Sequence, residues 1–298
     1  MCSHFCKKRW LIPILLVLGL SACSALFGPP PTPTPEIPTG TPVPPSPTPP
    51  PLAATVNGEW ITEMNFQAEV DRYMAAHQAL GLEVAADEAS ATVLEDMIDQ
   101  VVLSQAAREA GFEFTETDLQ SRLDALASQM GGVEALADWE TQHGYTDESF
   151  RYSLQRAVEA AWMRDKIIAE VPAAVEQVHA RQILLYNEET ARRVADQLDA
   201  GVSFSELAQL YDPTTGGELG WFPRGYLFEQ DLEEAAFNLE PGQYSEIIPS
   251  EVGYHIVQAL ERDANHQLSP DAYLVLQEKA LLDWLQDQRT KADIVRTP

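Results

Sequence analysis

Residues 216–225, Gly-Gly-Glu-Leu-Gly-Trp-Phe-Pro-Arg-Gly, form the centre of the segment that decides the fold. Glycine lets the backbone pass close to other groups and adopt positive φ, so this run predicts a loop that leads into a buried strand. One histidine lies on each side of it, in the runs 178–185 (VHARQILL) and 253–257 (GYHIV). Short runs of β-branched and apolar residues are typical of strands. Residues 175–263 are therefore predicted to form one sheet-containing domain.

The whole of this segment resembles the parvulin family of peptidyl-prolyl isomerases. The resemblance rests on the strand that carries His179, on the Gly-Gly-acid-Leu-Gly-Trp-Phe run, and on the closing Gly-Tyr-His-Ile around His255. It implies a four-stranded antiparallel sheet with surrounding helices. It also implies cis–trans isomerisation of X-Pro bonds without a cofactor.

The resemblance assigns a set of site residues. The two central histidines of the family fall on His179 and His255, on adjacent strands. Ser250 is placed to hydrogen-bond an imidazole and select its tautomer. The acid or thiol that starts the glycine loop falls on Asp212. The implied apolar wall for the proline ring consists of Leu227, Leu232 and Phe237.

Two features depart from the family pattern. Only Asp-Pro-Thr-Thr separates Tyr211 from Gly216, a shorter loop than family members carry, and Leu232 replaces the usual Phe after an extra residue. These departures leave an alternative function open, a non-catalytic peptide-binding holdase with a degenerate parvulin domain.

A zinc site formed by His179, His255 and Asp212 is another interpretation of the polar residues. No cysteine, HExxH motif or further ligand accompanies these three residues. No metal is therefore expected. Residues 186–189 (YNEE), after the first strand, are acidic. Phosphate-directed parvulins place a basic loop there to bind the dianion, so selectivity for phosphoserine-proline is not expected.

Residues 1–22 have the features of a secretory signal. Basic residues at positions 7–9 precede an apolar run, 11–20, that is short for a membrane span. The run ends in Leu-Ser-Ala-Cys, which resembles the lipobox of bacterial lipoproteins and implies lipid on Cys23. The protein is then expected outside the cytoplasm, anchored to a bacterial membrane. An ordinary signal peptide with a chance cysteine is the alternative.

Residues 23–52 are predicted to be a lipid-anchored tether. Thirteen prolines lie between positions 29 and 51, with threonines among them. This composition favours polyproline II at about 3.1 Å per residue, so the segment can extend over roughly 70 Å. A proline-rich ligand for a partner domain is the alternative interpretation.

Residues 53–174 are predicted to form a helical domain. An Asn-Gly turn at 57–58 comes first, and five helical segments follow, at about 62–80, 88–110, 115–130, 134–143 and 146–171. This pattern resembles the N-terminal chaperone region of extracytoplasmic foldases of the SurA and PrsA type. A last helix, from Ser269 to about Ala292 within residues 264–298, is expected to dock on it.

Length, net charge and cysteine content limit the classes of function that the chain can have. The chain has 298 residues, of which 45% are hydrophobic, enough for a substantial core. The net charge of −27 argues against a nucleic-acid partner. Cysteines occur only at positions 2, 6 and 23, so the globular part has no thiol chemistry. We expect an α+β isomerase and foldase for unfolded or partly folded secreted proteins. A solute-binding lipoprotein fits less well, because no two-lobed α/β pattern is present.

Overall fold

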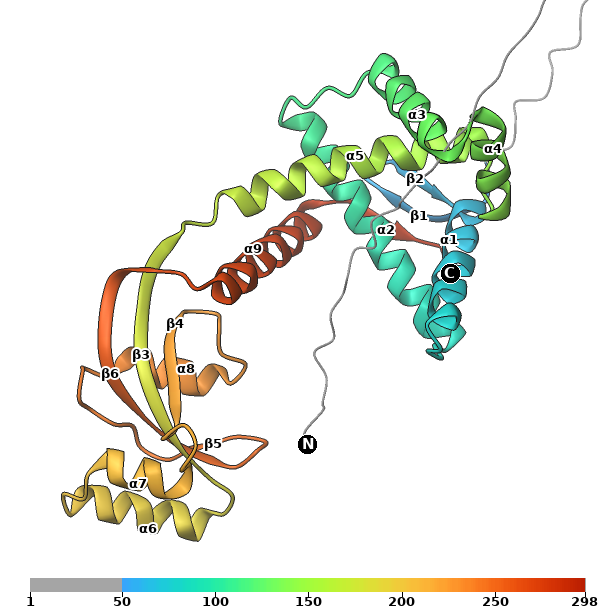
Figure 1. Cartoon of the computed structure of the whole chain (residues 1–298). Coiled ribbons are helices and arrows are strands. Elements are labelled where there is room, and N and C mark those ends of the chain that lie inside the picture. The colour runs from blue at the N-terminus through green and yellow to red at the C-terminus, as the bar shows by residue number, and fades with distance from the viewer. Residues whose placement is uncertain (1–49, 298) are drawn as a thin grey trace, which may run out of the picture. The chain divides into compact units, whose positions relative to one another are not determined.

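The computed structural model describes residues 50–297, which divide into two compact units (Figure 1). The first unit contains the described residues up to Met163 together with the chain end from Gln288. The second unit contains Arg164–Asp287. Within this described part, every helix is too short or too polar to cross a membrane.

Several predictions concern parts of the molecule that lie beyond this description. The signal segment, Cys23 and nearly all of the proline-rich tether fall outside residues 50–297. The docking of the last helix on the helical domain depends on how the two units are placed and stays a prediction.

The first unit begins with a β-hairpin. β1 (Leu52–Val56) pairs antiparallel with β2 (Glu59–Thr62), and the turn between them is Asn57-Gly58, with φ angles of 52° and 81°. Asn-Gly is the strongest short-range signal for a turn of positive φ, and the prediction is confirmed. β7 (Ile294–Arg296) pairs with the other edge of β1 and gives the order β2-β1-β7.

Helices make up the rest of the first unit. Thr62 caps the first helix by accepting a hydrogen bond from the backbone of Asn65, and Thr115 and Asp118 form a reciprocal capping box. Gly131 ends the third helix in the left-handed conformation. These local signals set the bounds, which agree with the predicted ones within a few residues. The helices are α1 (Glu63–Ala79), α2 (Ala86–Glu109), α3 (Glu116–Met130), α4 (Val133–Gln142) and α5 (Asp147–Ala169).

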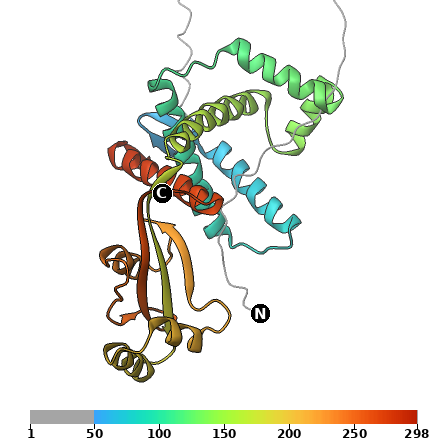
Figure 2. The same cartoon turned by 60° about the vertical axis from the view of Figure 1, so that its left-hand side comes forward.

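The second unit contains the predicted four-stranded antiparallel sheet, with the order β4-β3-β6-β5. β3 (Ala174–Leu185) and β6 (Tyr254–Gln267) pair along most of their length and lie side by side in Figures 1 and 2. β4 (Glu218–Pro223) and the short β5 (Ile248–Pro249) flank them. The helices of this part of the chain are α6 (Glu188–Asp199), α7 (Phe204–Tyr211), α8 (Gln230–Asn238) and α9 (Pro270–Lys291).

Two buried clusters lie on opposite faces of this sheet. On what we call the α6–α7 face, Ile183, Leu185 and Ile256 pack against α6 and α7. On the α8 face, the strand residues Val178, Ala180, Phe222, Val257 and Ala259 pack with Leu232, Ala236 and Phe237 of α8. Because side chains alternate between faces along a strand, Gln182 shares the α8 face with Val178 and Ala180. His179 lies on the other face.

Candidate functional site

Three polar side chains form a hydrogen-bonded chain on the α8 face. His255 Nε2 lies 2.8 Å from Ser250 Oγ, and His255 Nδ1 lies 2.7 Å from Gln182 Oε1. The amide oxygen can only accept, so Nδ1–H donates to Gln182 and Nε2 accepts from the Ser250 hydroxyl. This arrangement selects one neutral tautomer of the imidazole.

Burial reinforces the neutral state of this ring. His255 is only 3% exposed, and burial lowers the pKa of its imidazole below the ordinary value. The carboxylate of Glu229, just before α8, opposes that shift more weakly. His255 is therefore a fixed, uncharged hydrogen-bonding group at neutral pH.

A tight turn places Ser250 beside His255. Ser250 N donates to Gly253 O at 2.7 Å, and Val252 N donates to Ser250 Oγ at 3.1 Å. Gly253 has φ of +150°, and a Cβ there would lie 2.4 Å from Leu185 O. Only glycine lets the turn approach β3 this closely. The predicted partnership of Ser250 and His255 is thus present in the structure.

The glycine-rich loop contacts the hydrogen-bonded chain of Ser250, His255 and Gln182 at its Gln182 end. Gln182 N donates to Gly217 O at 2.8 Å. A Cβ on Gly217, which has φ of +73°, would lie 1.8 Å from Gln182 O. The two backbones are therefore in direct contact, and this contact holds Gln182 where its side chain meets His255.

Asp212 contacts neither histidine. Its carboxylate accepts hydrogen bonds from Thr214 N and Thr215 N, both at 3.1 Å, from Thr215 Oγ1, and from Gly217 N at 3.3 Å. The Thr215 hydroxyl and the backbone N–H groups hold the pKa of Asp212 below its usual range. Asp212 thus organises the short loop that positions Gly217, and it reaches the site only through that backbone.

His179 does not join His255. In the strand register His179 lies opposite Glu261, whereas His255 lies opposite Leu184. That offset of five residues is about 17 Å along the strand, and the two side chains point to opposite faces. The predicted histidine pair is therefore not formed. His179, His255 and Asp212 do not form one cluster, which the alternative interpretation as a zinc site would require.

His179 has different partners on its own face. Its Nε2 lies 2.5 Å from Glu218 Oε1 and its Nδ1 lies 3.4 Å from Glu261 Oε1. The ring stacks on Trp221 at 5.4 Å, and Trp221 stacks on His266 at 4.0 Å. Within residues 50–297, no group of three or more His, Cys, Asp or Glu side chains is arranged to hold a metal ion.

The predicted apolar residues gather near the chain of polar groups. Leu232 and Phe237 are 4% and 3% exposed within the cluster of the α8 face, and Leu227 packs against that cluster. The next residue, Phe228, is 94% exposed. Its sequence position beside Leu227 and Glu229 places an exposed aromatic side chain next to the buried apolar residues.

Gln182 and Phe228 are the residues that the sequence interpretation missed. The alternation of buried Val178 and Ala180 along β3 would have indicated Gln182, three positions after His179, as the residue on the same face as the cluster. No comparable local pattern distinguishes Phe228.

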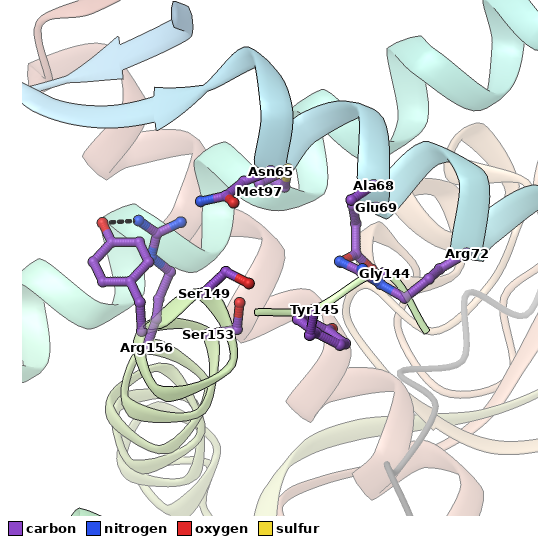
Figure 3. A pocket seen from close by; sticks show the side chains of 11 residues that line it. Asn65, Ala68, Glu69, Arg72, Met97, Gly144, Tyr145, Ser149, Ser153 and Arg156 are labelled. Carbon is purple, nitrogen blue, oxygen red and sulfur yellow. Dashed lines mark hydrogen bonds and ion pairs between the residues drawn. The ribbon is translucent and has the colours of Figure 1, made fainter. Parts of the chain in front are cut away.

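A small cavity in the first unit, lined mainly by residues of α1 and α5 and also by Met97 of α2, offers no comparable site (Figure 3). Its volume of about 20 Å³ accommodates roughly one water molecule. The two guanidinium groups that line it already have carboxylate partners, Arg72 with Glu69 at 2.5 Å and Arg156 with Glu59 at 3.4 Å. The arrangement in the second unit is thus the candidate functional site.

Comparison with known families matches both parts of the chain. Residues 178–261 match the model of the PPIC-type PPIase domain, and residues 48–147 match that of the SurA-like N-terminal domain. The first match contains the Ser250–His255–Gln182 chain and the apolar cluster of the α8 face.

Individual relatives match more than half of the chain. The chain is 29% identical to the foldase protein PrsA of Halalkalibacterium halodurans, over 68% of this chain and 66% of the relative. It is 30% identical to that of Geobacillus kaustophilus, over 58% and 62%. The chain therefore spans slightly less than two thirds of the length of these two relatives.

Among solved structures, the peptidylprolyl isomerase PrsA of Bacillus cereus is 24% identical, with a TM-score of 0.42, over 78% of this chain and 83% of that one. The parvulin of Nitrosopumilus maritimus is 29% identical, with a TM-score of 0.26, over 30% of this chain and all of that one. Both TM-scores are below 0.5, so the fold assignment rests on the family models and on the elements described above.

Proposed function

We propose that this chain, which carries a PPIC-type PPIase domain and a SurA-like N-terminal domain, is a peptidyl-prolyl cis–trans isomerase and foldase for polypeptides outside the cytoplasm. The observation that carries the proposal is the buried Ser250–His255–Gln182 chain beside an apolar cluster on one face of the sheet. Polar groups of fixed direction next to an apolar surface are what a twisting X-Pro bond requires.

The reaction needs stabilisation of a twisted amide and no covalent step. Rotation about the peptide bond faces a barrier of about 18–20 kcal/mol, because amide resonance must be broken. A rate gain of about 10⁴ requires roughly 5–6 kcal/mol of stabilisation that is greater in the transition state than in the ground state. An apolar wall takes the proline ring out of water, which strengthens every polar contact to the amide.

The residues divide into three roles in this proposal. Ser250 and His255 are the polar groups nearest the isomerising bond, and Gln182 positions His255 by accepting its Nδ1–H. Asp212 acts on the site only through the loop backbone at Gly217, because its carboxylate accepts hydrogen bonds within the loop. Leu227, Leu232 and Phe237 supply the apolar wall. His179 has no role in this site.

The alternative of a peptide-binding holdase receives less support. The match to an isomerase domain and the foldase names of the relatives favour turnover. A direct test measures isomerisation of an unphosphorylated X-Pro peptide by a soluble form that begins at residue 50, together with its suppression of client aggregation. Aggregation suppression without turnover would support the holdase and contradict the isomerase.

Anchoring by lipid on Cys23 is a further part of the proposal. Its support is the Leu-Ser-Ala-Cys run after an apolar segment, followed by a proline-rich stretch suited to a spacer. One acyl chain binds a membrane only marginally, so stable anchoring needs two or more. Mass spectrometry of the mature protein should find a diacylglyceryl group on an N-terminal Cys23. An unmodified mature N-terminus would contradict this part.

A further inference from the structure

The loop that follows β4 is held by a single carboxylate. Glu233, in the first turns of α8, accepts hydrogen bonds from three consecutive backbone N–H groups. Its Oε1 lies 2.7 Å from Gly225 N, and its Oε2 lies 2.9 Å from Tyr226 N and 3.0 Å from Leu227 N. Hydrogen bonds to a charged acceptor are roughly twice as strong as neutral ones. Three of them on successive residues fix the direction of the backbone at Leu227.

The opposite side of this loop packs against α9. Gly225 has φ of +83°, and a Cβ there would lie 2.8 Å from Lys279 Cδ and 3.0 Å from Lys279 Cε. Tyr226 OH lies 3.5 Å from Asp271 Oδ2, also on α9. The loop is thus confined between a carboxylate of α8 and side chains of α9.

This confined loop carries the residues that flank the apolar cluster of the site. Leu227 packs against that cluster, and Phe228 directly after it is 94% exposed. Glu229, which follows, is close enough to act on the pKa of His255. A shift of the backbone at residues 225–227 would therefore move both the apolar wall and a charge near the histidine.

We propose that Glu233 is a positioning residue that sets the substrate wall at Leu227 and Phe228 and thereby the affinity for the residues around the proline. This inference rests on the proposed isomerase function. Glu233 itself touches no reacting group, since its two oxygens are engaged by the backbone of the loop. It acts through the loop, and α9 limits how far the loop can move.

The main test replaces Glu233 and compares it with its neighbour. Glu233→Gln keeps one acceptor oxygen but turns the other into an amide that cannot accept. Glu234→Gln removes the same charge from an exposed residue of the same helix, for which no loop contact is present. We expect Glu233→Gln to raise KM for an X-Pro peptide about five- to tenfold with kcat within about twofold, the pattern of lost ground-state and transition-state binding. Glu234→Gln should match the wild type.

Amide hydrogen exchange in the full chain tests the loop itself. The Gly225, Tyr226 and Leu227 amides should be protected in the wild type and in Glu234→Gln, and should exchange faster in Glu233→Gln. Peptide Kd from NMR titration replaces KM if the chain has no turnover, so the inference and the proposed function can fail separately. Unprotected wild-type amides would overturn the inference. Faster exchange in Glu233→Gln without a change in KM or Kd would also overturn it. The same holds if Glu233→Gln lowers kcat as much as it raises KM and also lowers the Tm of the whole protein.

A pair of glycine variants tests the same loop from the side of α9. Gly225→Ala combines an unfavourable φ with a clash against Lys279, whereas Gly242→Ala, at φ of +93°, has no neighbour within 4 Å of the added Cβ. We expect Gly225→Ala to raise KM more than Gly242→Ala does. Adding Lys279→Ala to Gly225→Ala removes Cδ and Cε and should recover part of the loss. Equal effects of the two glycine variants would contradict the role of α9 in confining the loop.

Discussion

The sheet of the second unit carries His255 on one face and His179 on the other, and in each of these two rings both nitrogens have hydrogen-bond partners. His255, on the α8 face, bonds to Ser250 and Gln182, is 3% exposed, and lies beside a buried apolar cluster. His179, on the opposite face, lies between the carboxylates of Glu218 and Glu261 and stacks on Trp221. The residue type is the same, but the surroundings differ in charge and in access to water.

This difference shows why a histidine on a strand is not enough to define a site. Uncharged partners and burial keep His255 neutral and fixed in direction, and the apolar cluster beside it can exclude water from a bound proline. The partly exposed His179 has acidic partners and no buried apolar cluster next to it. Of the predicted polar residues, Ser250 and His255 therefore lie together on the α8 face, and His179 lies on the opposite face.

The largest expected effect separates the two histidines. His255→Ala should lower kcat/KM about a hundredfold, equal to about 2.7 kcal/mol of transition-state stabilisation, because the polar centre of the site is lost. His179→Ala should stay within about twofold of the wild type. An isomerase assay on both variants, with circular dichroism to verify folding, makes the comparison. Similar losses in the two variants would contradict the assignment to one face.

Removal of the partner of His255 should have the next largest effect. Gln182→Ala leaves the buried Nδ1–H without an acceptor, at a cost of about 1–3 kcal/mol. We expect a decrease of about tenfold in kcat/KM and a lower Tm. Gln258→Ala is the matched control, since Gln258 lies opposite Arg181 and bonds to that side chain on the other face. An unchanged Gln182→Ala enzyme would show that the tautomer of His255 does not depend on this contact.

A smaller effect is expected at Asp212. Because its carboxylate reaches the site only through Gly217, Asp212→Ala should lower kcat/KM about threefold, through a looser loop. Direct contact with the histidines would instead predict a loss of one or two decades. Asp212→Asn keeps an acceptor oxygen for Thr214 N and Thr215 N, and so should retain most activity. If Asp212→Asn is as impaired as Asp212→Ala, the charge itself acts on the site.

The pH dependence of stability should reflect the burial of His255. Its pKa is lowered in the folded chain, so below the ordinary histidine value of about 6.5 the unfolded chain binds a proton that the folded chain does not. Unfolding then takes up a proton, and the free energy of unfolding should decrease as the pH falls through this range. Urea unfolding at several pH values should give a shallower dependence for His255→Gln. An equal slope in both proteins would assign the dependence to other groups.

No effect is expected from phosphorylation of the peptide before proline. Residues 186–189 carry two acidic side chains, Glu188 and Glu189, and no basic one. Asn187 caps α6, and Glu188 accepts a hydrogen bond from Arg192 at 2.5 Å. That pairing leaves no cluster of basic side chains at the start of α6 for a dianion. Competition between phosphorylated and unphosphorylated forms of one X-Pro peptide measures this directly. A marked preference for the phosphorylated form would contradict it.

Local features of the fold could be predicted because their causes lie within a few residues. The Asn57-Gly58 turn, the Thr115–Asp118 capping box and the helix bounds depend on backbone geometry and on hydrogen bonds across three or four positions. The pairing of β7 with β1 could not be predicted in this way. It joins segments more than two hundred residues apart, and β7 has only three residues, too few for a periodic pattern.

The amino-acid sequence by itself determined the helices of the first unit, the Asn57-Gly58 turn and the glycine-rich loop before β4, and the family resemblance indicated the partnership of Ser250 and His255. Only the tertiary structure decided which residue of β3 meets His255. The register of β3 against β6 places Gln182, and not His179, on the α8 face together with His255. Side chains alternate with a period of two, so an error of three positions moves a residue to the other side of the sheet. That register depends on packing both faces of the sheet against distant elements, α6 and α7 on one side and α8 on the other. A local stretch of sequence therefore cannot predict it.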